Sequence, residues 1–122
     1  MTPQEYLDMV LKTYGPDMDD DVLFCMIGIA GEAGEIANMA QKCARGDFNG
    51  EDLRLVPKMS GNQCFNPAQR KKLIEEMGGV LYFMTALAHH LDTNLAKVMD
   101  INAKKLLSRL ERGTIRGDGD DR

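Results

Sequence analysis

The sequence has no tryptophan, only two histidines and only three cysteines among its 122 residues. Cys25, Cys43 and Cys64 are odd in number and never stand in Cys-x-x-Cys spacing, so neither a disulfide framework nor a structural zinc site is expected. Free thiols are typical of a reducing compartment, which favours a cytoplasmic location. His89 and His90 have no glutamate three residues before them, so a di-iron site is not expected and both are interpreted as structural or solvated.

Long apolar runs and an N-terminal targeting segment are also missing. Because no unbroken stretch of about 18 apolar residues occurs, a membrane-spanning helix is not expected. The first residues lack the basic start and apolar run of a signal peptide. The net charge of −4 argues against a nucleic-acid polymer or an anionic membrane as partner. The remaining composition, 43% hydrophobic and 28% charged, is that of a single globular domain whose modest core would gain from oligomerisation.

Turn signals separate four helical stretches. Thr2 and Glu5 form a predicted capping box that opens a helix ending near Tyr14, before Gly15-Pro16. A second helix is predicted over about residues 22–45. Its three glycines favour close approach of another helix, and they are Gly28, Gly31 and Gly34.

After a polar connection over about residues 46–66, Asn66 is the predicted N-cap of a third helix that runs to about residue 91. Asn94 caps a fourth helix that runs to about residue 112. The apolar spacing on these two helices predicts inward-facing residues. They are Leu73, Met77, Val80, Met84, Leu87 and Leu91 on the third, and Leu95, Val98, Met99, Leu106 and Leu110 on the fourth. The fold class is therefore all-α, a helical bundle of four main helices completed by oligomerisation.

Three glutamates on two of these helices could hold a metal ion. Glu32 and Glu35 stand three residues apart and share a helix face with apolar neighbours. Glu76 lies among apolar residues of the third helix. Buried carboxylates repel one another unless a cation meets them, and oxygen-only ligands suit Mg²⁺ or Mn²⁺. The alternative is that these glutamates form ordinary surface ion pairs with lysine or arginine.

The fourth helix carries a row of phosphate-binding side chain types. Asn102, Lys105 and Arg109 share one face of that helix, and amide and cationic donors of this kind recognise phosphate oxygens. Lysines and arginines on helices are also commonly solvated. A set of carboxylates that could hold a metal and a row of cations that could bind phosphate, together in one small bundle, indicate phosphate chemistry more specifically than either feature does alone.

The residues in these motifs resemble those of the MazG-like, all-α nucleoside-triphosphate pyrophosphohydrolases. Gly28-Ile29-Ala30-Gly31-Glu32-Ala33-Gly34-Glu35 is similar to their E-x-x-E helix, and residues 74–82 are similar to their second carboxylate helix. Asn102-Ala103-Lys104-Lys105-Leu106-Leu107-Ser108-Arg109 is similar to their N-x-x-K-L-x-x-R helix. The polar ending from Arg112 is similar to the tails of some members.

The resemblance implies a domain over residues 1–113 with a polar tail over residues 114–122. It implies Mg²⁺-dependent hydrolysis of an NTP or dNTP between the α and β phosphates, in a homodimer or homotetramer, with no nucleic-acid polymer or membrane as partner. The metal ligands and catalytic residues that it implies are Glu32, Glu35 and Glu76. The substrate-binding residues are Asn102, Lys105 and Arg109.

One position departs from the pattern of that family. Its second carboxylate helix reads E-x-x-D, and Gly79 stands here where the aspartate is expected. A water molecule could replace the missing ligand, because Mg²⁺ retains waters readily. The alternatives are a weakened enzyme, a protein that binds nucleotide or metal without turnover, and a plain helical interaction module.

Overall fold

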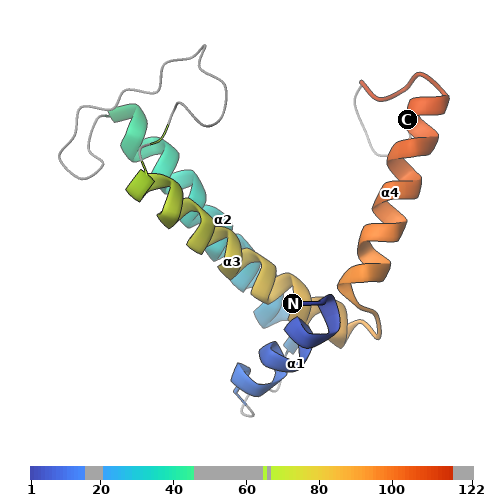
Figure 1. The fold of residues 1–122 in the computed structure, drawn as a ribbon, viewed down its shortest axis with the longest axis horizontal. Coiled ribbons are helices and arrows are strands. Elements are labelled where there is room, and N and C mark those ends of the chain that lie inside the picture. Colours follow the sequence, from blue (N-terminus) through green and yellow to red (C-terminus); the bar gives the residue numbers. More distant parts are fainter. Residues whose placement is uncertain (16–20, 46–64, 66, 117–122) are drawn as a thin grey trace.

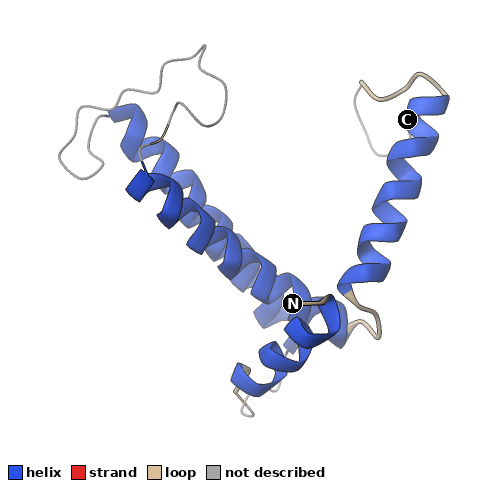
Figure 2. Cartoon of the chain, in the orientation of Figure 1, coloured by secondary structure: helices blue, strands red, loops and turns tan. Residues whose placement is uncertain are grey.

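The computed structural model describes residues 1–15, 21–45, 65 and 67–116, without the side chains of 43–45. These residues form α1 (Pro3–Thr13), α2 (Asp21–Arg45), α3 (Pro67–His90) and α4 (Leu95–Glu111), with no β-strand among them (Figure 2). The all-α fold with four main helices is thus confirmed. The predicted bounds of the helices agree with the observed ones to within a residue. The predicted cap at Asn66 lies outside the described residues.

The helices α2 and α3 form a long antiparallel hairpin (Figure 1). The contacts between the two helices keep one register: moving forward by a number of residues on α2 corresponds to moving back by the same number on α3. Asp21 meets His90, Gly28 meets Phe83 and Glu32 meets Gly79. A Cβ added at Gly28 would lie 2.5 Å from the Phe83 ring, so this glycine is what lets the two helices approach. Gly31 and Gly34 face open space, and the predicted role in close packing is wrong for them.

Helix α1 packs against α3 and closes a small core at the end of the hairpin where α2 begins. Val10, Cys25 and Ala86 are buried there, surrounded by partly buried aromatic and aliphatic side chains. The capping box forms as predicted: the Thr2 hydroxyl accepts from the Glu5 backbone N–H at 3.2 Å, and the Thr2 N–H donates to the Glu5 carboxylate at 2.6 Å. The core and the cap together fix the position of α1.

A tight joint connects α3 to α4. Asp92 adopts a positive φ of 54°, and the N–H groups of Asp92 and Thr93 donate to the carbonyls of His89 and Ala88 at 3.0 and 2.9 Å. This is the Schellman arrangement that ends a helix. Asn94 then caps α4 as predicted, since its side-chain oxygen accepts from the Lys97 N–H at 2.9 Å.

Helix α4 leaves the hairpin at an angle, and the two arms form a V (Figure 1). The predicted inward faces are therefore partly wrong. On α4, Val98, Met99, Leu106 and Leu110 are exposed, because no described helix covers them. On α3, the predicted stripe combined two neighbouring faces: Leu73, Val80 and Leu87 are partly buried, while Met77 and Met84 are exposed. Leu91, which follows the last residue of α3, is also exposed.

One segment, Asp21–Lys42 within α2, is long and apolar enough to cross a bilayer, with a mean hydropathy of 1.4. Three glycines and two glutamates interrupt the apolar run of this segment, but its average hydropathy stays high. The segment packs along α3 and carries Glu32 and Glu35. One such helix is weak evidence for a membrane span, since core helices of soluble proteins meet the same criterion of length and composition; here only 11% of the apolar window is buried.

Candidate functional site: glutamates of the helical hairpin

Glu32 is the glutamate most closely built into the hairpin. Its side chain is half-buried and lies across the backbone of Gly79 on α3. A Cβ at position 79 would collide with the Glu32 carboxylate. An aspartate at position 79, as the family pattern expects, would therefore need the space that the Glu32 carboxylate occupies. Sequence spacing could not reveal this conflict.

The hairpin register relates the other two glutamates to this pair. Moving one helical turn along α2 from Glu32, and one turn back along α3 from Gly79, brings Glu35 level with Glu76. Glu76 is half-buried, whereas Glu35 is exposed. The expectation that Glu32 and Glu35 both lie in a buried seam is therefore met only by Glu32.

These carboxylates do not form a closed ligand set in the structure. Within the described residues, no group of three histidine, cysteine, aspartate or glutamate side chains is arranged to hold a metal ion. The three glutamates occupy two adjacent levels of one hairpin, and closing them around a cation requires side-chain rotation. Their assignment as metal ligands and catalytic residues remains a prediction.

The predicted substrate-binding row is on the other arm of the V. Asn102 and Lys105 are exposed on α4, while Arg109 is buried with 5% of its surface exposed. Helix α4 contacts α3 near their joint and diverges from it beyond (Figure 1). Within one chain, the described residues therefore keep the cationic row apart from the glutamates of the hairpin.

A polar cluster at the base of the hairpin was not expected from the sequence. The Tyr14 hydroxyl lies 3.1 Å from the buried Cys25 sulfur, and the Tyr14 ring lies against the ring of His90 with centroids 5.5 Å apart. His90 Nδ1 is 3.7 Å from the Asp21 carboxylate. Burial, reinforced by the hydrogen bond to Cys25, raises the pKa of Tyr14. These four residues come from three parts of the fold that are separate in the sequence, so no local sequence motif predicts the cluster.

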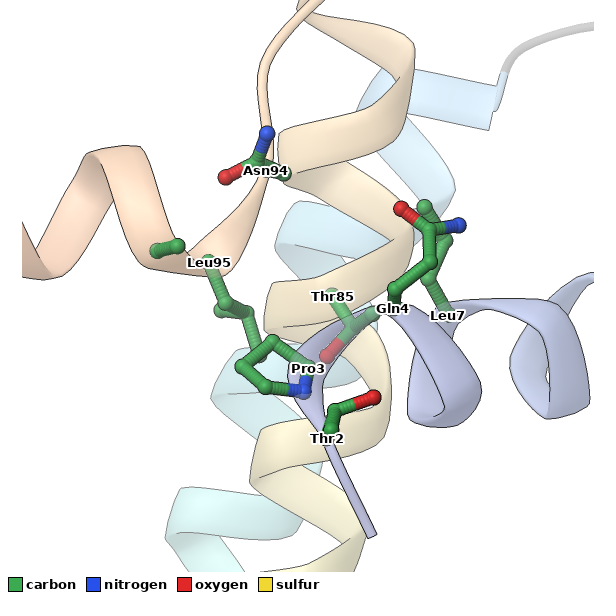
Figure 3. Close-up of a pocket in the computed structure, with 8 residues that line it drawn as sticks. Thr2, Pro3, Gln4, Leu7, Thr85, Asn94 and Leu95 are labelled. Carbon is green, nitrogen blue, oxygen red and sulfur yellow. The ribbon is translucent and has the colours of Figure 1, made fainter.

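A shallow pocket of about 240 Å³ lies where the first turns of α1 and α4 meet α3 (Figure 3). Thr2, Gln4, Thr85 and Asn94 contribute its polar atoms. Three of these side chains already have local roles: Thr2 and Asn94 cap their helices, and the Thr85 hydroxyl donates to the Leu81 carbonyl at 2.7 Å. The pocket is therefore interpreted as a structural junction of three helices.

The fold and the hairpin geometry define a small all-α protein built around two long antiparallel helices. No family model matches the chain, and no solved structure matches it. A relative is the Gene 37 protein of Mycobacterium phage L5, which is 35% identical over 106 residues, covering 87% of this chain and 81% of that protein. The chain therefore belongs to the family of the mycobacteriophage Gene 37 protein. That name states no activity.

Proposed function

We propose that this chain is a nucleoside-triphosphate pyrophosphohydrolase that needs Mg²⁺, or Mn²⁺ in its place. In the proposed reaction, water attacks the α phosphorus and the bond to the bridging oxygen breaks. The products are a nucleoside monophosphate and pyrophosphate. Bound cations neutralise phosphate charge in such reactions, where positioning and electrostatics supply most of the catalysis.

The observation that carries the proposal is the half-buried carboxylate of Glu32, held at the interface of two helices with Glu35 and Glu76 one turn away. Partial burial of a carboxylate without a nearby lysine or arginine is costly unless a cation or a hydrogen-bond donor compensates it. No lysine or arginine occurs between Asp21 and Gln41, or between Leu73 and His90. Ordinary intrahelical ion pairs therefore do not account for Glu32.

The proposal includes the remaining expectations from the resemblance. Glu32, Glu35 and Glu76 hold the metal, and Asn102, Lys105 and Arg109 bind the phosphates. The active unit is a homodimer or homotetramer in the cytoplasm, and residues 1–113 form the domain.

A second candidate is a module that binds nucleotide or metal without turnover. The absence of a three-ligand group from the described part of the chain, together with Gly79, favours it. The two candidates differ only in whether product forms, so one assay separates them.

The test is pyrophosphate release from a panel of NTPs and dNTPs with Mg²⁺ or Mn²⁺, and with EDTA. We expect release that EDTA abolishes and that Glu32→Gln lowers at least about 100-fold, as loss of a preorganised charged group does. Glu75→Gln is the matched control, because Glu75 is exposed and pairs with Lys71 at 3.8 Å on the same helix. Metal-dependent stabilisation without release would favour the binding module. Equal effects of the two substitutions would show that Glu32 is not part of the site.

A further inference from the structure

A row of exposed apolar side chains runs along α3. These residues, here called the α3 stripe, recur at spacings of three, four and seven; they are Ile74, Met77, Leu81 and Met84 of α3, and Leu91, which directly follows the last residue of α3. Between 39 and 63% of each remains exposed. With Ile36 of α2, most of the stripe lines an open groove of about 530 Å³. Heptad-like spacing of this kind is typical of a seam that receives another helix.

A second exposed apolar row lies on α4. This α4 face consists of Val98, Met99, Leu106 and Leu110, each at least 36% exposed. Helix α4 has 17 residues and is about 26 Å long, at 1.5 Å per residue. The α3 stripe spans the same length from Ile74 to Leu91, again about 26 Å. The groove itself is lined from Ile74 to Met84, so a helix as long as α4 would cover it and continue over the rest of the stripe, and both surfaces are apolar.

The joint between α3 and α4 holds most of α4 away from the groove of its own chain in the structure (Figure 1). The turn is held by the hydrogen bonds of Asp92 and Thr93, and only Leu91 to Asn94 separate the two helices. Leu95 at the start of α4 is also packed beside Pro3 of α1 (Figure 3). Folding α4 back onto α3 would break the hydrogen bonds of this turn.

Charge also favours α4 as the occupant of the groove. Helix α4 exposes Lys97, Lys104 and Lys105, of which Lys97 and Lys104 pair with Asp100 at 4.0 and 2.9 Å. The middle of the hairpin carries Glu32, Glu35 and Glu76 on segments 21–41 and 73–90, which contain no lysine or arginine. Complementary charge of this kind steers association and selects the orientation of the partners.

We propose that two copies of this chain dimerise by reciprocal exchange of α4, each α4 lying along the α3 stripe of the other copy. In a dimer with twofold symmetry, the α4 face of each chain covers the α3 stripe of the other chain. The exchange completes a bundle that a single chain leaves open. It rests on packing and charge alone, so it holds whether or not the proposed hydrolysis does.

The first test is the molar mass in solution, measured by light scattering during size-exclusion chromatography. We expect a dimer for the natural chain and a monomer for Leu81→Arg, which places a charge at the centre of the α3 stripe. Leu11→Arg on α1 is the matched control, because Leu11 and Leu81 are 40 and 41% exposed. Circular dichroism of both variants checks that the helices remain. A natural chain that stays monomeric at high micromolar concentration overturns the proposal.

The second test distinguishes exchange from other dimers. One batch carries Leu81→Cys and another Ala103→Cys, both with serine at positions 43 and 64, and a short bis-maleimide joins exposed thiols. Positions 81 and 103 are central in the stripe and in α4, so they meet whichever way α4 runs. We expect covalent dimers chiefly in the mixture of the two batches. Coupling within a single chain carrying both substitutions, or only between two Leu81→Cys chains, overturns the exchange.

A lipid surface is the competing occupant, because α2 also exposes Leu23, Met26 and Ile27. Flotation with vesicles of neutral and of anionic lipid decides between them. We expect the natural chain to stay with the unbound fraction as a dimer. Binding to vesicles that Leu81→Arg abolishes would overturn the dimer and assign the stripe to the membrane.

Discussion

At the scale of single residues, two glycines determine how closely the helices of the hairpin approach. Gly28 makes room for the Phe83 ring, and Gly79 makes room for the Glu32 carboxylate. The two glycines respond differently to an added side chain, because a packed ring has few alternative positions and a carboxylate at the end of a side chain has several.

Replacing Gly28 by alanine tests the tighter of these contacts. The added methyl group forces Phe83 or a helix to move, so we expect a loss of about 1–3 kcal/mol, typical of overpacking. Gly31→Ala is the control on the same helix; it faces open space and should stabilise the chain by about 0.5–1 kcal/mol. Urea denaturation of both variants gives the comparison. A neutral Gly28→Ala would mean that the hairpin is looser than the structure shows.

Gly79→Asp tests the metal hypothesis at the position of the missing ligand. The new carboxylate pushes the Glu32 carboxylate aside and lies next to it, so we expect a lower melting temperature without Mg²⁺. Mg²⁺ should restore about 1.4 kcal/mol when its concentration is roughly ten times Kd. Gly78→Asp is the control, since position 78 has no neighbour within 4 Å of an added Cβ. Identical Mg²⁺ responses in the two variants would contradict a metal site at this level of the hairpin.

Tyr14 links stability to alkaline pH. Burial raises the pKa of Tyr14 above the unfolded value of about 10, so folding favours the protonated phenol. This stabilisation is fully present below about pH 10 and is lost as the pH rises through the folded pKa. We expect the denaturation midpoint to fall above about pH 10, and to fall less in Tyr14→Phe. Some dependence should remain, because burial also raises the pKa of Tyr6.

At the scale of elements, the helix ends were the most predictable part of the chain. Thr2 and Asn94 act through neighbours within a few residues, so their roles are encoded locally. The turn at Asp92 was not predicted, because glycine is the usual residue at a helix end with a positive φ. The inward faces of α3 and α4 were partly wrong for a different reason. Periodicity gives the apolar side of a helix but does not tell which neighbour covers it.

Asp92→Gly tests the joint between α3 and α4. Glycine adopts the positive φ without the steric penalty that an aspartate side chain meets, so we expect a gain of about 0.5–1 kcal/mol in thermal unfolding. Asp92→Ala should lose stability instead, since alanine keeps the penalty and lacks the polar side chain that tolerates this region. Equal stability of the glycine and alanine variants would show that the turn relaxes in solution.

Only part of the candidate site was predictable, because local sequence spacing does not show contacts between residues that are far apart in the sequence. Spacing indicated that Glu32 and Glu35 share a face, and the apolar neighbours of Glu76 indicated a third carboxylate on another helix. It could not show that Glu32 lies over Gly79, which requires the register of two helices far apart in sequence. The cluster of Tyr14, Cys25 and His90 depends on three parts of the fold and escaped prediction for the same reason.

At the scale of the whole molecule, the V-shaped arrangement of α4 and the hairpin divides the chain into parts of unequal local stability. Amide hydrogens in α2 and α3 are protected by mutual packing, whereas those of an isolated α4 open by local fraying. Hydrogen–deuterium exchange should therefore show α4 exchanging first in dilute solution. If α4 is exchanged between copies, its protection should rise with protein concentration while that of the hairpin changes less. The rate of deuterium uptake in α4 would therefore report whether the chains have associated.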